Sequence, residues 1–157
     1  MGIKPKFTRR DMDVLFKDRL QRIDQAITLA LCVLGEKCVN HARDLDPIAG
    51  FGDVTGNLRS SIGYVVYRNG SPVKTDFKLK SGPKGSGATG YSVGQSLATE
   101  IAAKYPKGYV LVVVAGMNYA VYVESKGRDV LTSAEKLAET ELPKMLRQLK
   151  DNIRKMK

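Results

Sequence analysis

The sequence has little of what catalysis or metal binding usually requires. It contains one histidine, His41, two cysteines and no tryptophan. A nucleophile–histidine–acid set would depend on His41 alone, and Ser60 and Ser61 lie at the predicted start of a strand rather than on a sharp strand-to-helix turn. A structural metal site would need further ligands. We therefore expect no enzyme, no metal and no cofactor, and a solvated or capping role for His41.

Cysteine usage and hydropathy bear on the cellular compartment. Cys32 and Cys38 would lie ~9 Å apart along a helix axis, which is too far for an unstrained disulfide. Both are expected to be small buried or half-buried residues in a reducing cytoplasm. No apolar run approaches the ~20 residues that span a bilayer, and the basic N-terminus is not followed by the apolar core of a signal peptide.

Positive charge dominates and is unevenly distributed. The net charge is +10, with 26 basic and 16 acidic residues. The excess falls in residues 1–22, 59–84 and 126–157, whereas residues 23–58 carry more acidic than basic groups. Such a surface attracts polyanions through counterion release, so a weak, sequence-independent contact with DNA is one expectation. The sequence has no helix-turn-helix, zinc or RNP motif that would read a base sequence.

A glycine-rich segment, residues 81–90, contains the pattern G-x-G-x-x-G from Gly85 to Gly90. A dinucleotide site needs this pattern between the strand and the helix of a βαβ unit, with an acidic residue about 20 positions further on. Here the preceding segment is polar and no βαβ unit follows. We predict a mobile surface loop that binds no nucleotide.

Two pairs of carboxylates were considered for acid–base chemistry or Mg²⁺ binding. They are Asp44 with Asp46, and Glu124 with Asp129. The first pair is typical of a polar helix end. Glu124 ends an alternating segment, which favours a structural ion pair with Arg59 or Arg128 over a metal.

A long amphipathic helix is predicted near the N-terminus. Thr8 and Asp11 form a capping box at its start, and Asp46-Pro47 ends it. Apolar residues recur at steps of three and four, at Met12, Phe16, Leu20, Ile23, Ile27, Leu31, Leu34, Cys38, Ala42 and Leu45. Such a helix would be ~50 Å long, longer than a four-stranded sheet can cover. The surplus stripe at Met12, Phe16 and Leu20 is therefore predicted to be an assembly surface for a neighbouring subunit.

Four strands are predicted after this helix. They are residues 60–68, 73–77, 109–115 and 119–124. Asn69-Gly70 is a strong hairpin signal between the first two, and Pro72 indicates that the second is an edge strand. The third is a continuous apolar run and is predicted to be central. In the fourth, Tyr119 and Tyr122 would point to opposite faces of the sheet.

Two further helices complete the expected fold. A short inserted helix at about 92–105 begins at the capping box Ser92-x-x-Gln95, and a final helix begins at Thr132-x-x-Glu135, with a kink or break at Pro143. The predicted fold is a single α+β domain, residues 1–157. Its four-stranded, mostly antiparallel sheet is packed by the long N-terminal helix and the C-terminal helix.

Two short motifs lie between the terminal helices. The first is Thr-Gly-x-Leu-x-x-Ser, and the second is Tyr-Ala-x-Tyr-x-Glu followed by a glycine. The residues that carry them are Thr55, Gly56, Asn57, Leu58, Arg59, Ser60 and Ser61, then Tyr119, Ala120, Tyr122, Glu124 and Gly127. In this order the motifs resemble those of the head–tail joining proteins of tailed phages, also called neck or tail-completion proteins. The segment Ser125-Lys126-Gly127-Arg128 departs from the aromatic-Gly-Thr of many relatives, and the insertion at 71–108 is longer than in the simplest members.

The resemblance implies a structural virion protein that joins the capsid connector to a preassembled tail, as copies in a ring. The implied partners are connector or head-closure proteins and tail terminator or tail tube proteins, with a location in the host cytoplasm during assembly and then in the virion neck. No catalytic residues come with this family. The alternative hypothesis is a basic nucleic-acid-binding or regulatory protein that reads no particular sequence.

Overall fold

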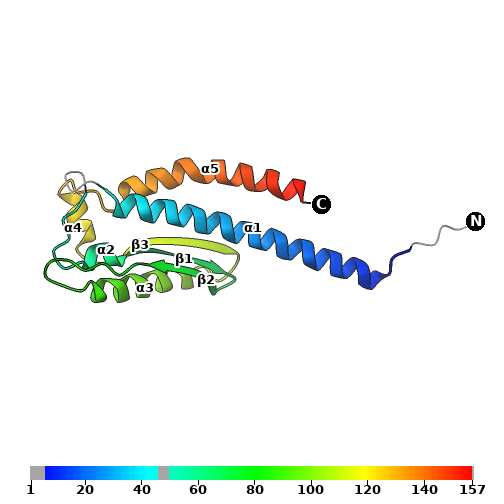
Figure 1. The fold of residues 1–157 in the computed structure, drawn as a ribbon, viewed down its shortest axis with the longest axis horizontal. Coiled ribbons are helices and arrows are strands. Elements are labelled where there is room, and N and C mark those ends of the chain that lie inside the picture. The colour runs from blue at the N-terminus through cyan, green and yellow to red at the C-terminus, as the bar shows by residue number, and fades with distance from the viewer. Residues whose placement is uncertain (1–5, 46–49, 157) are drawn as a thin grey trace, which may run out of the picture.

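The structure, a computed structural model, describes residues 6–45 and 50–156. It has three layers and an outer helix (Figure 1). The elements are α1 (Arg9–Arg43), α2 (Asn57–Ser61), β1 (Ile62–Arg68), β2 (Ser71–Phe77), α3 (Ala88–Ala103), β3 (Tyr109–Ala115), α4 (Ala120–Ser125) and α5 (Thr132–Lys155). α1 covers one face of the sheet and α3 the other, while α5 runs antiparallel along the side of α1 that faces away from the sheet.

The predicted long helix is confirmed, including the capping box at its start. The Thr8 backbone N–H donates to Asp11 Oδ2 over 2.8 Å, and the Asp11 N–H donates to Thr8 Oγ1 over 3.2 Å. α1 ends at Arg43, slightly before the predicted stop. Asp46 and Pro47, which were expected to end it, lie outside the described residues.

The sheet has three antiparallel strands in the order β2-β1-β3, so the prediction of four strands is wrong. β1 is central, and the apolar strand β3, predicted to be central, lies at an edge opposite β2. The hairpin between β1 and β2 is confirmed, because Asn69 and Gly70 both have positive φ, 48° and 78°. The strand at 60–68 begins only at Ile62, since Ser60 and Ser61 close the short helix α2.

The missing fourth strand is the helix α4. The Val123 N–H donates to the Tyr119 carbonyl over 3.0 Å, which is helical spacing. Ala120 is buried and Val123 half-buried, whereas Val121 and Tyr122 face outward. A segment of six residues fits the periods of both a strand and a helix, and its β-branched valines favoured the strand. The expectation that Tyr119 and Tyr122 point to opposite faces of a sheet is therefore wrong.

The start of α3 differs from the sequence prediction, and α5 begins at Thr132 as predicted but without the predicted cap. α3 begins at Ala88 behind a left-handed Gly87, and not at Ser92. α5 begins after Leu131, and no side chain of its predicted capping box caps it. Pro143 lies inside α5 without ending it. At the starts of α3 and α5 a side chain from another element, Asn57 or Glu124, binds backbone N–H groups in place of the predicted local capping boxes.

Two apolar cores lie on the two faces of the sheet. Ile62, Tyr64 and Val66 of β1 face α1, while Val65 and Tyr67 face α3. Gly35 of α1 allows the closest approach, because a Cβ there would lie 2.6 Å from the ring of Tyr64. A glycine that weakens the helix thus lets it pack directly on the sheet. Within the described ranges, none of the helices combines the length and apolar character of a membrane span.

Candidate assembly surfaces

The N-terminal part of α1 extends beyond the sheet and beyond the end of α5 (Figure 1). Every residue from 6 to 22 is exposed. The predicted assembly surface lies here, with Met12 40%, Phe16 60% and Leu20 65% exposed. These residues continue the stripe that farther along α1 forms the core, at Leu34 and Cys38. A helix of this length is only marginally stable by itself in water, so a covering partner would stabilise it.

The charge on this exposed part of α1 is mainly positive. Arg9 and Arg19 lie three or seven residues from Met12 and Phe16, so they share the face of the apolar stripe. Arg22 is held by Asp18 at 2.9 Å. Val14 is as exposed as Phe16, at 60%, but lies on the opposite side of the helix. Asp13 lies three residues from Phe16 and seven from Leu20, so the assembly surface is an apolar stripe with two arginines and one aspartate on the same face.

The first sequence motif joins α2 to the glycine-rich segment. Gly56 has φ 78°, and a Cβ there would lie 1.9 Å from the Lys80 carbonyl oxygen. The Asn57 Oδ1 accepts the backbone N–H of Gly90 over 3.2 Å. Ser60 Oγ donates to the Lys80 carbonyl over 3.1 Å and accepts the Lys80 N–H over 2.8 Å. The segment predicted to be a mobile surface loop is therefore packed against this motif.

The remaining motif residues are buried. Leu58 contributes to the core on the α1 side of the sheet. Ser61 Oγ donates to the Leu58 carbonyl over 2.8 Å and accepts the Met117 N–H over 3.3 Å. The motif thus connects three backbone segments, α2, the glycine-rich segment and the turn after β3. Gly56, Asn57, Leu58 and both serines therefore contribute to packing or to hydrogen bonds within the fold.

Arg59 does not bind Glu124, one of the pairings that the sequence favoured. It binds residues at the C-terminal end of α1 and in the loop that follows. Its guanidinium donates to the Arg43 carbonyl, approaches Asp53 at 3.9 Å and lies 5.3 Å from the ring centre of Phe51. Arg43 is itself buried and donates to the Ile62 carbonyl. Burial lowers the pKa of Arg43 from its ordinary value. The two arginines together fix the C-terminal end of α1 to the start of β1.

Glu124 of the second motif caps α5. Its Oε1 accepts the N–H groups of Leu131 over 2.7 Å, Thr132 over 3.0 Å and Val130 over 3.3 Å, and the Thr132 hydroxyl over 3.1 Å. Burial opposes ionisation, but these donors outweigh it and hold the pKa of Glu124 below its ordinary value. The predicted ion pair is wrong, since the carboxylate binds a helix N-terminus. Arg128 donates instead to the Gly50 carbonyl over 3.2 Å.

Residues next to Glu124 also stabilise the connection between α4 and α5. Gly127, with φ 77°, ends α4 and turns the chain back towards α5. Asp129 Oδ1 accepts the Ser133 N–H over 3.2 Å, and the His41 ring nitrogen lies 2.9 Å from Ser133 Oγ. In residues 6–45 and 50–156, no three His, Cys, Asp or Glu side chains gather closely enough to hold a metal ion.

The outer face of α4 carries a second exposed apolar group, at the end of the molecule opposite the start of α1 (Figure 1). Tyr119, Val121 and Tyr122 are 37%, 75% and 63% exposed. The Lys126 ammonium lies 5.2 Å from the ring centre of Tyr122. Both tyrosines belong to the second sequence motif. As residues of a strand they were predicted to lie on opposite faces, and only the helical conformation brings them to the same surface.

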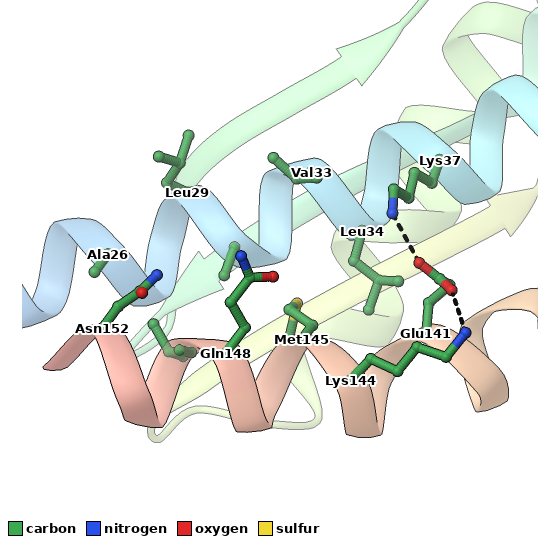
Figure 2. A pocket seen from close by; sticks show the side chains of 12 residues that line it. Ala26, Leu29, Val33, Leu34, Lys37, Glu141, Lys144, Met145, Gln148 and Asn152 are labelled. Atoms are coloured by element: carbon green, nitrogen blue, oxygen red, sulfur yellow. Dashed lines mark hydrogen bonds and ion pairs between the residues drawn. The ribbon is translucent and has the colours of Figure 1, made fainter. Parts of the chain in front are cut away.

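Two grooves follow α5, and sequence reasoning found neither. The first, about 360 Å³, lies on the seam between α1 and α5, where Glu141 bridges Lys37 at 2.7 Å and Lys144 at 3.1 Å (Figure 2). The second, about 540 Å³, lies between α1, β3 and α5. Its lining residues are Leu31, Leu34, Cys38, Leu111, Val113, Leu131, Ala134, Glu135, Ala138 and Leu142. The second groove forms only when three elements pack together, so no local sequence pattern predicts it.

Comparison of the chain with protein-family models, with curated proteins and with solved structures found no match. What the protein does is therefore inferred from its own surfaces and contacts, together with the two sequence motifs.

Proposed function

We propose that this protein is a structural subunit that joins the capsid connector to the tail of a tailed phage or prophage. The observation that carries the proposal is the exposed part of α1. There the apolar stripe of the core continues past the fold, through Met12, Phe16 and Leu20, with every residue from 6 to 22 exposed. A stripe of this kind is typical of a helix that is buried only on assembly.

The roles of the motif residues support a scaffold. Asn57 and Ser60 hold the glycine-rich segment, and Glu124 holds the start of α5. Each uses its polar atoms within the fold. Such residues make a rigid body, which a subunit needs when it bears load between two preassembled structures.

The two exposed apolar groups lie at opposite ends of the long axis (Figure 1). Surfaces at opposite ends suit a subunit that meets a different neighbour at each end of its long axis. The proposed neighbours are connector or head-closure proteins on one side and tail terminator or tail tube proteins on the other. The protein would act in the host cytoplasm during assembly and then remain in the neck of the virion.

The test replaces Phe16 by Asp in the phage or prophage genome. Because Phe16 is exposed, the isolated variant should stay folded, yet full heads and separate tails should accumulate in electron micrographs of lysates. Val14→Asp is the matched control, since Val14 is equally exposed on the other side of the helix. Normal particle yields from Phe16→Asp would reject the proposal.

A further inference from the structure

We propose that the groove between α1, β3 and α5 receives the exposed part of α1 from a second copy of this chain. The inference rests on the proposed assembly role and names the contact between neighbouring subunits. It gives the stripe at Met12, Phe16 and Leu20 a specific receptor. The groove and the stripe belong to different parts of the fold, so each copy offers one of each.

The groove matches an apolar helix in chemistry and in length. Its walls are aliphatic, with Leu111 and Val113 from β3 and Leu31 from α1. Leu142, on the α5 wall, is 38% exposed, and Leu146, one turn farther, is 51% exposed. From Leu131 to Leu142 the groove wall is ~17 Å long, and the helix from Arg9 to Arg22 is ~20 Å long. A helix laid in such a groove uses side chains at spacings of three and four, as this stripe does.

Charge complementarity supports the pairing. Glu135 lines the groove, and Glu139 lies one turn farther on the same face of α5. Both are exposed, and in the part of the chain that the structure describes neither forms an ion pair. The stripe of α1 carries Arg9, Arg19 and Asp13 on its own face, so that face has a net positive charge. Carboxylates beside the receptor and guanidinium groups beside the stripe would favour this register over others.

The other groove on α5 is a poorer receptor. It is bordered by Lys37 and Lys144, and its one carboxylate, Glu141, already binds both lysines (Figure 2). The hydrogen bonds that Glu141 accepts lower its pKa, which favours its charged form. An arginine-bearing stripe would meet two positive groups there. The charges around the two grooves therefore favour the groove beside β3 as the binding site for the stripe of α1.

A copy cannot fill its own groove, because α1 is one continuous helix whose later turns form a wall of that groove. The contact must be intermolecular and head-to-tail. A variant with a damaged stripe and a variant with a damaged groove should then form mixed dimers through the one intact pair, and nothing larger. A symmetric contact between two stripes would give no such dimer.

The experiment uses the purified full chain with a photo-crosslinking phenylalanine analogue at position 16, or at position 14 as the matched control. We expect position 16 to crosslink to peptides that carry Leu142 or Leu111 of another copy, and position 14 to give far less. Glu135→Arg should raise the self-association Kd roughly ten-fold, and Arg19→Glu should recover part of the loss. Asp151→Arg, on an exposed part of α5 outside the groove, is the charge control.

Three results would overturn the inference. They are a chain that stays monomeric up to its solubility limit, crosslinks from position 16 that map to another surface, and an equal effect of Glu135→Arg and Asp151→Arg. Self-association is measured on the purified chain, whereas the proposed function is judged by particles in lysates. If position 16 gives no crosslinks to the groove but Phe16→Asp still blocks particle assembly, the groove is rejected as the receptor and the assembly role stands. If the crosslinks form but Phe16→Asp gives normal particles, the assembly role is rejected and the contact between copies stands.

Discussion

The two parts of α1 share one apolar stripe but have different surroundings. Leu34 and Cys38 in the C-terminal part are 4% and 2% exposed, whereas Phe16 and Leu20 in the N-terminal part are 60% and 65% exposed. The spacing of apolar residues is the same in both. The comparison teaches that periodicity identifies the face of a helix that will be covered, but not the molecule that covers it.

The largest contrast is expected from matched truncations of the two parts. Leu34→Ala should lower the free energy of unfolding by about 2–4 kcal/mol, because it leaves a cavity in the core. Leu20→Ala should change it by less than about 0.5 kcal/mol in the monomer, since Leu20 is exposed. Urea unfolding followed by circular dichroism measures both. Equal losses would mean that the N-terminal part of α1 is packed within the monomer.

A glycine-to-alanine change sharpens the contrast. In an exposed helix this change stabilises by about 1 kcal/mol. At Gly35 the added Cβ would lie 2.6 Å from the Tyr64 ring, so Gly35→Ala should instead destabilise by about 1–3 kcal/mol. Thermal unfolding of the purified variant shows whether the substitution raises or lowers the stability of the protein. A stabilised variant would show that α1 can move away from the sheet at little cost.

The cap of α5 should matter to the whole fold in a pH-dependent way. Glu124→Gln is expected to lower stability by about 1–2 kcal/mol at neutral pH, since a charged acceptor of three N–H groups becomes neutral. The folded state lowers the pKa of Glu124, so this contribution is present above the ordinary carboxylate pKa and is lost as pH falls through the lowered value. Melting temperatures of both proteins should therefore converge in acid. A constant difference across pH would contradict the ionised cap.

The smallest global effect is expected at the other cap. Thr8→Ala removes the capping box of α1, but the first turns of that helix are exposed, so the free energy of unfolding should change by less than about 0.5 kcal/mol. The loss should be local, as faster hydrogen exchange at residues 12–20 while residues 34–43 keep their protection. Faster global unfolding or a large loss of stability would mean that the two parts of α1 unfold as one cooperative unit.

Capping signals show why local patterns succeeded at one end of the chain and failed elsewhere. Thr8 and Asp11 are close in sequence, and within residues 6–45 and 50–156 no side chain from another segment binds their backbone donors, so their capping box formed as predicted. At α5 the predicted capping box does not form, because Glu124 of α4 accepts the backbone N–H groups at the start of that helix. At α3, Asn57 of α2 binds Gly90, and the helix extends a turn earlier than its own sequence suggests.

The sequence by itself determined the long helix, the hairpin at Asn69-Gly70 and the apolar stripe that extends to Phe16, because each depends on residues a few positions apart. Only the tertiary structure decided that residues 120–125 form a helix, that β3 lies at an edge and that Glu124 caps α5. It also created the groove beside Leu111 and Glu135. These features depend on which distant segments compete for the same backbone groups and apolar surface, and that competition is settled only when the whole chain packs.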